Sequence, residues 1–225
     1  MQKGKLCYNN HGVFMRQRNV KNKKEIINNS KYIILNPREF KGKWQEVFNN
    51  NYPIYIEIGM GKGDFIIENA INNPQINYIG IEKYDSIVAL AIKKIEKYDI
   101  PNLKLIRMDA LNILDIFDME IDKIYLNFSD PWPKERHAKR RLTSDIFLNK
   151  YDVILKNKAS IEMKTDNRGL FEYSLISFND NHYEIKEISL DLHHSNLLNN
   201  IMSEYEKKFS QMNNLIYYVK VQKMK

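Results

Sequence analysis

The sequence predicts a single α/β domain in which a mostly parallel β-sheet is covered by helices on both faces. Segments typical of buried strands alternate with amphipathic helical segments from residue 54 onward. A glycine-rich turn at residues 59–63 joins the first such strand to the first such helix. Acidic residues lie at or just past successive strand ends, where open α/β sheets bind their ligands. Together these features predict a Rossmann-like fold.

Composition favours one ordinary globular domain. The 225 residues are 43% hydrophobic, and no apolar run approaches the ~18 residues that a membrane span requires. The polar start gives no sign of a secretory signal, and the single cysteine, Cys7, has no partner for an internal disulfide. We therefore expect a cytoplasmic protein without a membrane partner. The sequence does not choose between a monomer and a homodimer.

The positive charge is concentrated at the N-terminus. Residues 1–43 contain eleven Lys and Arg against two acids, so the other 182 residues carry a net charge of −2 out of the total of +7. We expect residues 1–43 to be a basic, largely flexible arm and residues 44–225 to be the folded domain. A basic arm on a nearly neutral body indicates a polyanionic partner. The alternative is that a Lys- and Asn-rich stretch reflects coding bias and disorder.

Each element is predicted from its local pattern. Trp44, Val47 and Phe48 share one face of a short helix, which Asn49–Asn51 ends. The helix that begins at Asp85 has apolar residues at helical spacing and stops before Pro101. The predicted strands are residues 54–58, 77–81, 103–107, 123–128 and 159–164, and the predicted helices are residues 64–70, 85–98, 143–155 and 167–178. Residues 183–190 and 215–221 are rich in aliphatic and aromatic side chains, and residues 203–209 form a polar helix between them.

The first strand leads into a turn typical of nucleotide-binding folds. Its pattern is Glu57-x-Gly59-x-Gly61-x-Gly63, and Glu82 lies 21 residues after Gly61, where such folds place an acid that holds ribose hydroxyls. A dinucleotide motif would have its third glycine one residue later, and Glu57 would repel a pyrophosphate. Glu57, Glu82 and Asp109 together favour a cationic cofactor, S-adenosylmethionine.

The most distinctive stretch runs from Tyr125 to Arg141. A strand ends near Asp130, Trp132 lies between Pro131 and Pro133, and five Lys and Arg residues follow. The prolines restrict the backbone, so this loop should hold the Asp130 carboxylate rigidly beside positive charge, an arrangement suited to a polyanionic substrate. The alternative is a core tryptophan in a proline turn, followed by a solvated basic helix.

With these residues in view, the chain from about Met15 onward resembles the bacterial tRNA (guanine-N7)-methyltransferases. The shared blocks are residues 57–63, 79–82, 125–141, 164–168 and 203–209. The glycine block is common to many methyltransferases, whereas residues 128–134 paired with the Lys164-Thr165-Asp166 block are close to diagnostic. Two positions depart from the pattern, because Glu135 replaces a commonly basic residue and Ser203 replaces a threonine.

The resemblance implies a class I S-adenosylmethionine-dependent fold and methyl transfer to N7 of guanosine 46 in the tRNA variable loop. It implies that Asp130 is the catalytic residue and that S-adenosylhomocysteine is the product. The implied cofactor site is Glu57, Gly59, Gly61, Glu82, Asp109 and Asp130. The implied guanosine contacts are Lys134, Asp166, Ser203, Glu204, Tyr205 and Glu206, and the implied RNA contacts are Arg136, His137, Lys139, Arg140 and Arg141.

Two alternatives stay open from the sequence. An amino-methyltransferase acting on adenine or cytosine would have prolines before the aromatic residue of the loop, unlike Trp132 here. A Rossmann-like scaffold that binds RNA without catalysis is the alternative from another class. The adjacent His193 and His194 could suggest a metal, but neighbouring side chains point to opposite sides, and we expect no metal.

Overall fold

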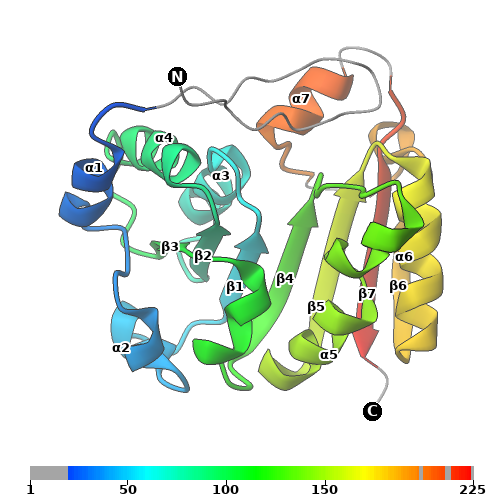
Figure 1. Ribbon diagram of the computed structural model, residues 1–225, viewed down its shortest axis with the longest axis horizontal. Helices are drawn as coiled ribbons and strands as arrows, with labels where there is room; N and C mark the ends of the chain where they lie inside the picture. Colours follow the sequence, from blue (N-terminus) through cyan, green and yellow to red (C-terminus); the bar gives the residue numbers. More distant parts are fainter. Residues whose placement is uncertain (1–19, 198–199, 211–213, 224–225) are drawn as a thin grey trace.

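The computed structural model describes residues 20–197, 200–210 and 214–223, and within them the chain forms one α/β domain around a seven-stranded sheet (Figure 1). The strand order is β3-β2-β1-β4-β5-β7-β6. The strands are β1 (Ile54–Ile58), β2 (Asn77–Glu82), β3 (Leu103–Arg107), β4 (Ile121–Asn127), β5 (Leu155–Thr165), β6 (Tyr183–Ser189) and β7 (Tyr217–Lys223). The first five are parallel, and β7 runs antiparallel to both β5 and β6. The predicted, mostly parallel sheet is confirmed.

Helices cover both faces of the sheet, each over its own apolar core. On one face, Trp44, Phe147 and Phe171 pack with strand residues such as Ile56 and Ile124. The helices of this face are α2 (Trp44–Phe48), α5 (Asp145–Ile154) and α6 (Arg168–Asp180). The opposite core belongs to α1 (Lys23–Asn29), α3 (Asp64–Asn72) and α4 (Asp85–Ile95). Burial on both faces explains why the central strands are nearly continuous runs of apolar residues.

Residues 20–43 correct the expectation of a flexible arm. Ile27, Tyr32 and Ile33 are buried, and α1 packs against α4. The backbone extends the sheet edge, because Leu105 N donates to Tyr32 O (2.8 Å) and Ile34 N donates to Leu105 O (2.9 Å). These few apolar side chains are too widely spaced to give a helical period, but they pack on a surface that the rest of the chain supplies. Residues 1–19 lie outside the described residues.

The sheet places its ligand-binding edge at the carboxyl ends of the parallel strands. Strand order reverses between β1 and β4, and such a switch point opens a crevice beyond the strand ends. Helix α7 (Glu204–Ser210) lies beyond the carboxyl ends of β4 and β5 (Figure 1). Four short 3-10 helices complete the described fold: η1 (Pro37–Phe40), η2 (Ala110–Asp115), η3 (Glu135–Arg140) and η4 (Leu192–His194). No helix in the described part of the chain is long and apolar enough to cross a membrane.

Candidate active site

The glycine turn between β1 and α3 bends tightly at the switch point. Gly59 and Gly61 have φ of 79° and 58°, a region that side chains disfavour, and nothing lies within 4 Å of a Cβ built on either. The glycines are therefore required for backbone conformation, and the space beside them is open. Gly61 N also donates to Glu82 Oε2 (3.2 Å), which joins the turn to the end of β2.

Glu57, on β1, is a buried carboxylate with an unused acceptor. Its Oε1 accepts from Asn127 Nδ2 (2.9 Å), whereas Glu57 Oε2 and Asn127 Oδ1 are buried and accept no hydrogen bond within the described residues. Burial raises the pKa of Glu57 to about 8, although Asn127 and the Lys164 charge oppose the shift. Two buried acceptors without donors are costly alone and fit a ligand that carries an ammonium group.

The acid that ends β2, Glu82, and the acid that follows β3, Asp109, are held by backbone and lysine donors. Glu82 Oε1 accepts from Lys83 N (2.8 Å) and Tyr84 N (3.0 Å), yet burial still raises the Glu82 pKa. Asp109 caps η2 through Leu111 N (3.0 Å) and pairs with Lys83 Nζ (2.5 Å). Burial alone would raise the Asp109 pKa, but these donors outweigh it and the pKa is lowered. Both carboxylates have a fixed orientation at the same sheet edge.

Asp130 lies in the loop after β4, near Glu82. Its side chain keeps access to solvent, while the surrounding protein partly desolvates the carboxylate and raises its pKa. The charge of Asp130 in turn contributes to the raised pKa of Glu82. The structure therefore brings together Glu57, Glu82, Asp109 and Asp130 at neighbouring strand ends, as the sequence predicted for their positions; their roles stay predictions.

The loop that carries Asp130 is strained and braced. Phe128 and Trp132 have φ of 50° and 42°, which costs roughly 1–2 kcal/mol for each such residue. Arg141 holds the loop from outside, donating from Nε to Pro131 O (3.1 Å) and from a terminal nitrogen to Trp132 O (3.0 Å). The Arg141 guanidinium also lies over the Tyr173 ring (4.2 Å). The loop is rigid because of this arginine as well as the prolines.

Trp132 is not a core residue, so that alternative is wrong. Its ring is half-buried, with the Arg140 guanidinium 4.9 Å from the ring centroid and the His137 ring edge-to-face at 5.8 Å. Among the predicted RNA contacts, Arg136, Lys139 and Arg140 are exposed on η3, as is Lys134 before it. Arg141 differs, because its guanidinium already binds two loop carbonyls.

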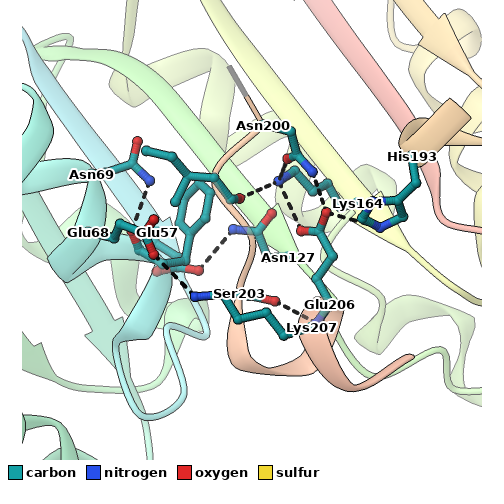
Figure 2. A network of polar contacts seen from close by, with 12 residues as sticks. Glu57, Glu68, Asn69, Asn127, Lys164, His193, Asn200, Ser203, Glu206 and Lys207 are labelled. Atoms are coloured by element: carbon teal, nitrogen blue, oxygen red, sulfur yellow. Dashed lines mark hydrogen bonds and ion pairs between the residues drawn. The ribbon is translucent and has the colours of Figure 1, made fainter. Parts of the chain in front are cut away.

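The segment that we call the strap, residues 200–207, is fixed to the end of β5 by Lys164 (Figure 2). Lys164 Nζ donates to Ile201 O (2.9 Å), to Glu206 Oε2 (3.1 Å) and to Asn200 Oδ1. Glu206 has no exposed surface, and its Oε1 accepts from Asn200 Nδ2 (2.5 Å) and faces His193 Nε2 (3.5 Å). Every described contact of Glu206 is internal, although we predicted a substrate contact for it.

The other predicted substrate residues lie around this strap. Ser203 caps α7, because its Oγ accepts from Glu206 N (3.1 Å), and the Tyr205 ring packs near the Phe128 ring (5.8 Å). Asp166 is half-buried just after β5. The side chain of Glu204 lies outside the described residues. The strap therefore brings Tyr205 against the loop that carries Asp130.

Sequence reasoning missed Asn127 and Lys164 as site residues. They are register partners on β4 and β5, so both lie at the strand ends where ligands bind. Their position at the ends of two predicted strands was the signal that could have identified them as site residues. The sequence could not show that Asn127 contacts Glu57 or that Lys164 contacts Glu206, because each pair joins distant parts of the chain.

The strand order, the glycine turn and the acids at the strand ends define a class I methyltransferase. Two solved structures have the same fold. The aminoglycoside resistance methyltransferase NpmB1 matches with a TM-score of 0.60 at 15% identity, covering 83% of this chain and 93% of that one. A 16S rRNA (adenine(1408)-N(1))-methyltransferase from Catenulisporales acidiphilia, determined with the cosubstrate SAM, has a TM-score of 0.57 at 13% identity, covering 85% and 93%.

Sequence relatives identify the family. A family model described as a putative methyltransferase matches residues 51–219. The tRNA (guanine-N(7)-)-methyltransferase of Lachnoclostridium phytofermentans is 52% identical over 205 residues, 90% of this chain and 96% of the relative. The enzyme of that name from Streptococcus mutans is 53% identical over 207 residues, 91% and 98% respectively. The chain belongs to the tRNA (guanine-N(7)-)-methyltransferase family.

Proposed function

We propose that this protein transfers a methyl group from S-adenosylmethionine to N7 of a guanosine in tRNA, and that the target is guanosine 46 of the variable loop. Family membership supports the reaction, and the resemblance seen in the sequence supports the position. The observation that carries the proposal is the buried pair of unused acceptors, Glu57 Oε2 and Asn127 Oδ1, beside the open glycine turn.

The residues at this edge fit S-adenosylmethionine. Glu57 and Asn127 would accept hydrogen bonds from the α-ammonium of the cofactor. Gly59 and Gly61 would lie beside the bound cofactor, and Glu82 would accept hydrogen bonds from its ribose hydroxyls. Asp109, at the start of η2, would lie towards the adenine end. When bound, the cofactor supplies an electrophilic methyl group on a sulfonium.

Methylation of guanine N7 requires alignment more than proton transfer. N7 has an in-plane lone pair and no proton, so no general base is required. The protein has to align N7 with the methyl group, an orientation effect that can supply several kcal/mol. Positive charge develops on the purine during transfer, and the fixed carboxylate of Asp130 would stabilise that charge more strongly in the transition state than before it.

Substrate contacts come from the loop, from β5 and from the strap. Lys134 would donate to guanine O6 or to a nearby phosphate, and Asp166 would accept from the guanine N1–H and amino groups. Arg136, Lys139 and Arg140 are exposed on η3 and would hold RNA phosphates, which position the RNA without selecting the base. The cytoplasmic location and the choice between monomer and homodimer stay predictions.

The proposal is tested by incubating the protein with unmodified tRNA and labelled S-adenosylmethionine, followed by nucleoside analysis. We expect 7-methylguanosine at position 46, and a tRNA with adenosine at that position should stay unlabelled. Methylated adenosine or cytidine would favour the amino-methyltransferase alternative. If calorimetry detects no cofactor binding, the scaffold that binds RNA without catalysis would be favoured.

A further inference from the structure

Lys164 is a buried cation whose described hydrogen-bond partners all belong to the strap. Its side chain is 7% exposed, and Nζ donates to Asn200 Oδ1, Ile201 O and Glu206 Oε2. Lys164 itself sits on β5, so the ammonium reaches from the sheet into the strap (Figure 2). A buried ion pair is stable only if both charges stay compensated, and here Glu206 provides the compensation.

A second buried carboxylate lies close to Lys164. Asn127, its register partner on β4, donates to Glu57 Oε1, and the Lys164 charge acts on Glu57. Glu57 Oε2 has no donor within the described residues. Glu57 is therefore an acid that two cations could neutralise: the Lys164 ammonium, or the ammonium of a bound ligand.

We propose that Glu206 holds the Lys164 ammonium on the strap and away from Glu57, so that Glu57 stays free for the ammonium of the cofactor. The inference rests on the proposed function, in which the Glu57 carboxylate binds the α-ammonium group of S-adenosylmethionine. Glu206 and Lys164 are then positioning residues. The strap sets cofactor affinity without touching the cofactor, and its buried acid serves the cofactor pocket rather than the guanosine.

The physical argument concerns the fate of Lys164 when Glu206 loses its charge. A buried ammonium left without its carboxylate costs several kcal/mol, and the flexible lysine stem lets the group move to another acid. Among the buried carboxylates of the described residues, Glu57 is the one with an oxygen that accepts no hydrogen bond. Once paired with Glu57, the Lys164 ammonium would both occupy that oxygen and repel a second cation.

The test compares two ligands that differ in the ammonium-bearing part. S-adenosylhomocysteine carries the amino acid group, whereas 5′-methylthioadenosine lacks it. Calorimetry at pH 8 should show that Glu206→Gln weakens S-adenosylhomocysteine binding roughly tenfold or more, as expected for a competing buried charge, while leaving methylthioadenosine within about twofold. The double variant Lys164→Met, Glu206→Met removes the competing cation and should recover most of the loss.

Lys207→Met provides the matched control. Lys207 Nζ pairs with Glu68 Oε2 (3.3 Å) and also joins the strap to α3, but both partners are exposed. This variant should bind both ligands like the wild type. Unchanged S-adenosylhomocysteine affinity in Glu206→Gln, equal losses for both ligands, or no recovery in the double variant would each overturn the inference. A wild type that does not prefer S-adenosylhomocysteine would refute the proposed cofactor site itself.

Discussion

Two carboxylates of the site differ in their surroundings, and this difference fits the different roles that we propose for them. Glu57 is buried, and its Oε2 and Asn127 Oδ1 form a pair of acceptors without donors among the described residues, whereas Asp130 keeps access to solvent on a braced loop. Burial raises the pKa of both groups, most strongly for Glu57. An enclosed acid suits a small cationic ligand, and an acid at the rim suits a base presented by a large RNA.

Replacing Asp130 with asparagine should slow the chemical step without removing the cofactor site. Asn keeps the size but loses the charge that would stabilise the developing purine cation. We expect kcat to fall about 100-fold or more, the magnitude typical of one lost electrostatic contact, with S-adenosylhomocysteine affinity within a few-fold. Single-turnover methylation and calorimetry measure the two effects. Asp99→Asn, which alters an exposed pair with Lys31, is the control. A variant that retained most of its kcat would disprove the role.

Cofactor binding should release a proton, because the pKa of Glu57 is raised to about 8 in the free protein. Below that pH the free carboxyl is largely protonated, whereas an ammonium ligand requires the carboxylate. S-adenosylhomocysteine affinity should therefore rise roughly tenfold per pH unit between pH 6 and 7. Calorimetry in buffers of different ionisation enthalpy should show about one proton released per complex. Glu57→Gln should abolish the release, and a pH-independent affinity in the wild type would contradict the assignment.

At the scale of elements, Arg140 ends η3 and Arg141 follows it directly, but the two side chains make different contacts. Arg141 donates to Pro131 and Trp132 carbonyls, whereas Arg140 is exposed over the Trp132 ring. Arg141→Met should loosen the loop, costing about 1–3 kcal/mol of stability and lowering kcat. Arg140→Met should keep kcat, raise KM for tRNA and reduce the salt dependence of binding by about one phosphate contact.

Thermal unfolding and tRNA titrations at several salt concentrations distinguish the two effects. The opposite pattern, with a flatter salt dependence in the Arg141 variant alone, would mean that Arg141 leaves the loop to bind RNA.

The sequence predicted the ends of an element best where a proline or glycine, which interrupts regular structure, lies next to it. The bounds of β1 and β3 agree with the predicted strands, because Pro53 and Gly59 flank β1 and Pro101 precedes β3. By contrast, β5 begins at Leu155, four residues before the predicted start, since α5 runs directly into it without a breaker. The site acids were predicted because each lies at or just past the end of a strand. The Lys164–Glu206 pair was not, because it depends on how the strap folds back over β5.

For the whole molecule, the N-terminal 43 residues should divide into two parts with different roles. Residues 1–19 contribute four of the basic residues and no acid, and residues 20–43 pack on α4 and the β3 edge. Deleting residues 1–19 should weaken tRNA binding and flatten its salt dependence, because four positive charges are lost.

Deleting residues 1–43 should instead destabilise the fold. Burial of Ile27, Tyr32 and Ile33 is worth about 1.5–3 kcal/mol per side chain, and their loss is large against the 5–15 kcal/mol that ordinarily separates folded from unfolded protein. Since one kcal/mol shifts Tm by roughly 2–4 °C in a chain of this size, we expect a fall of about 10 °C or more. Equal Tm values for the two truncated proteins would show that residues 20–43 are dispensable for folding.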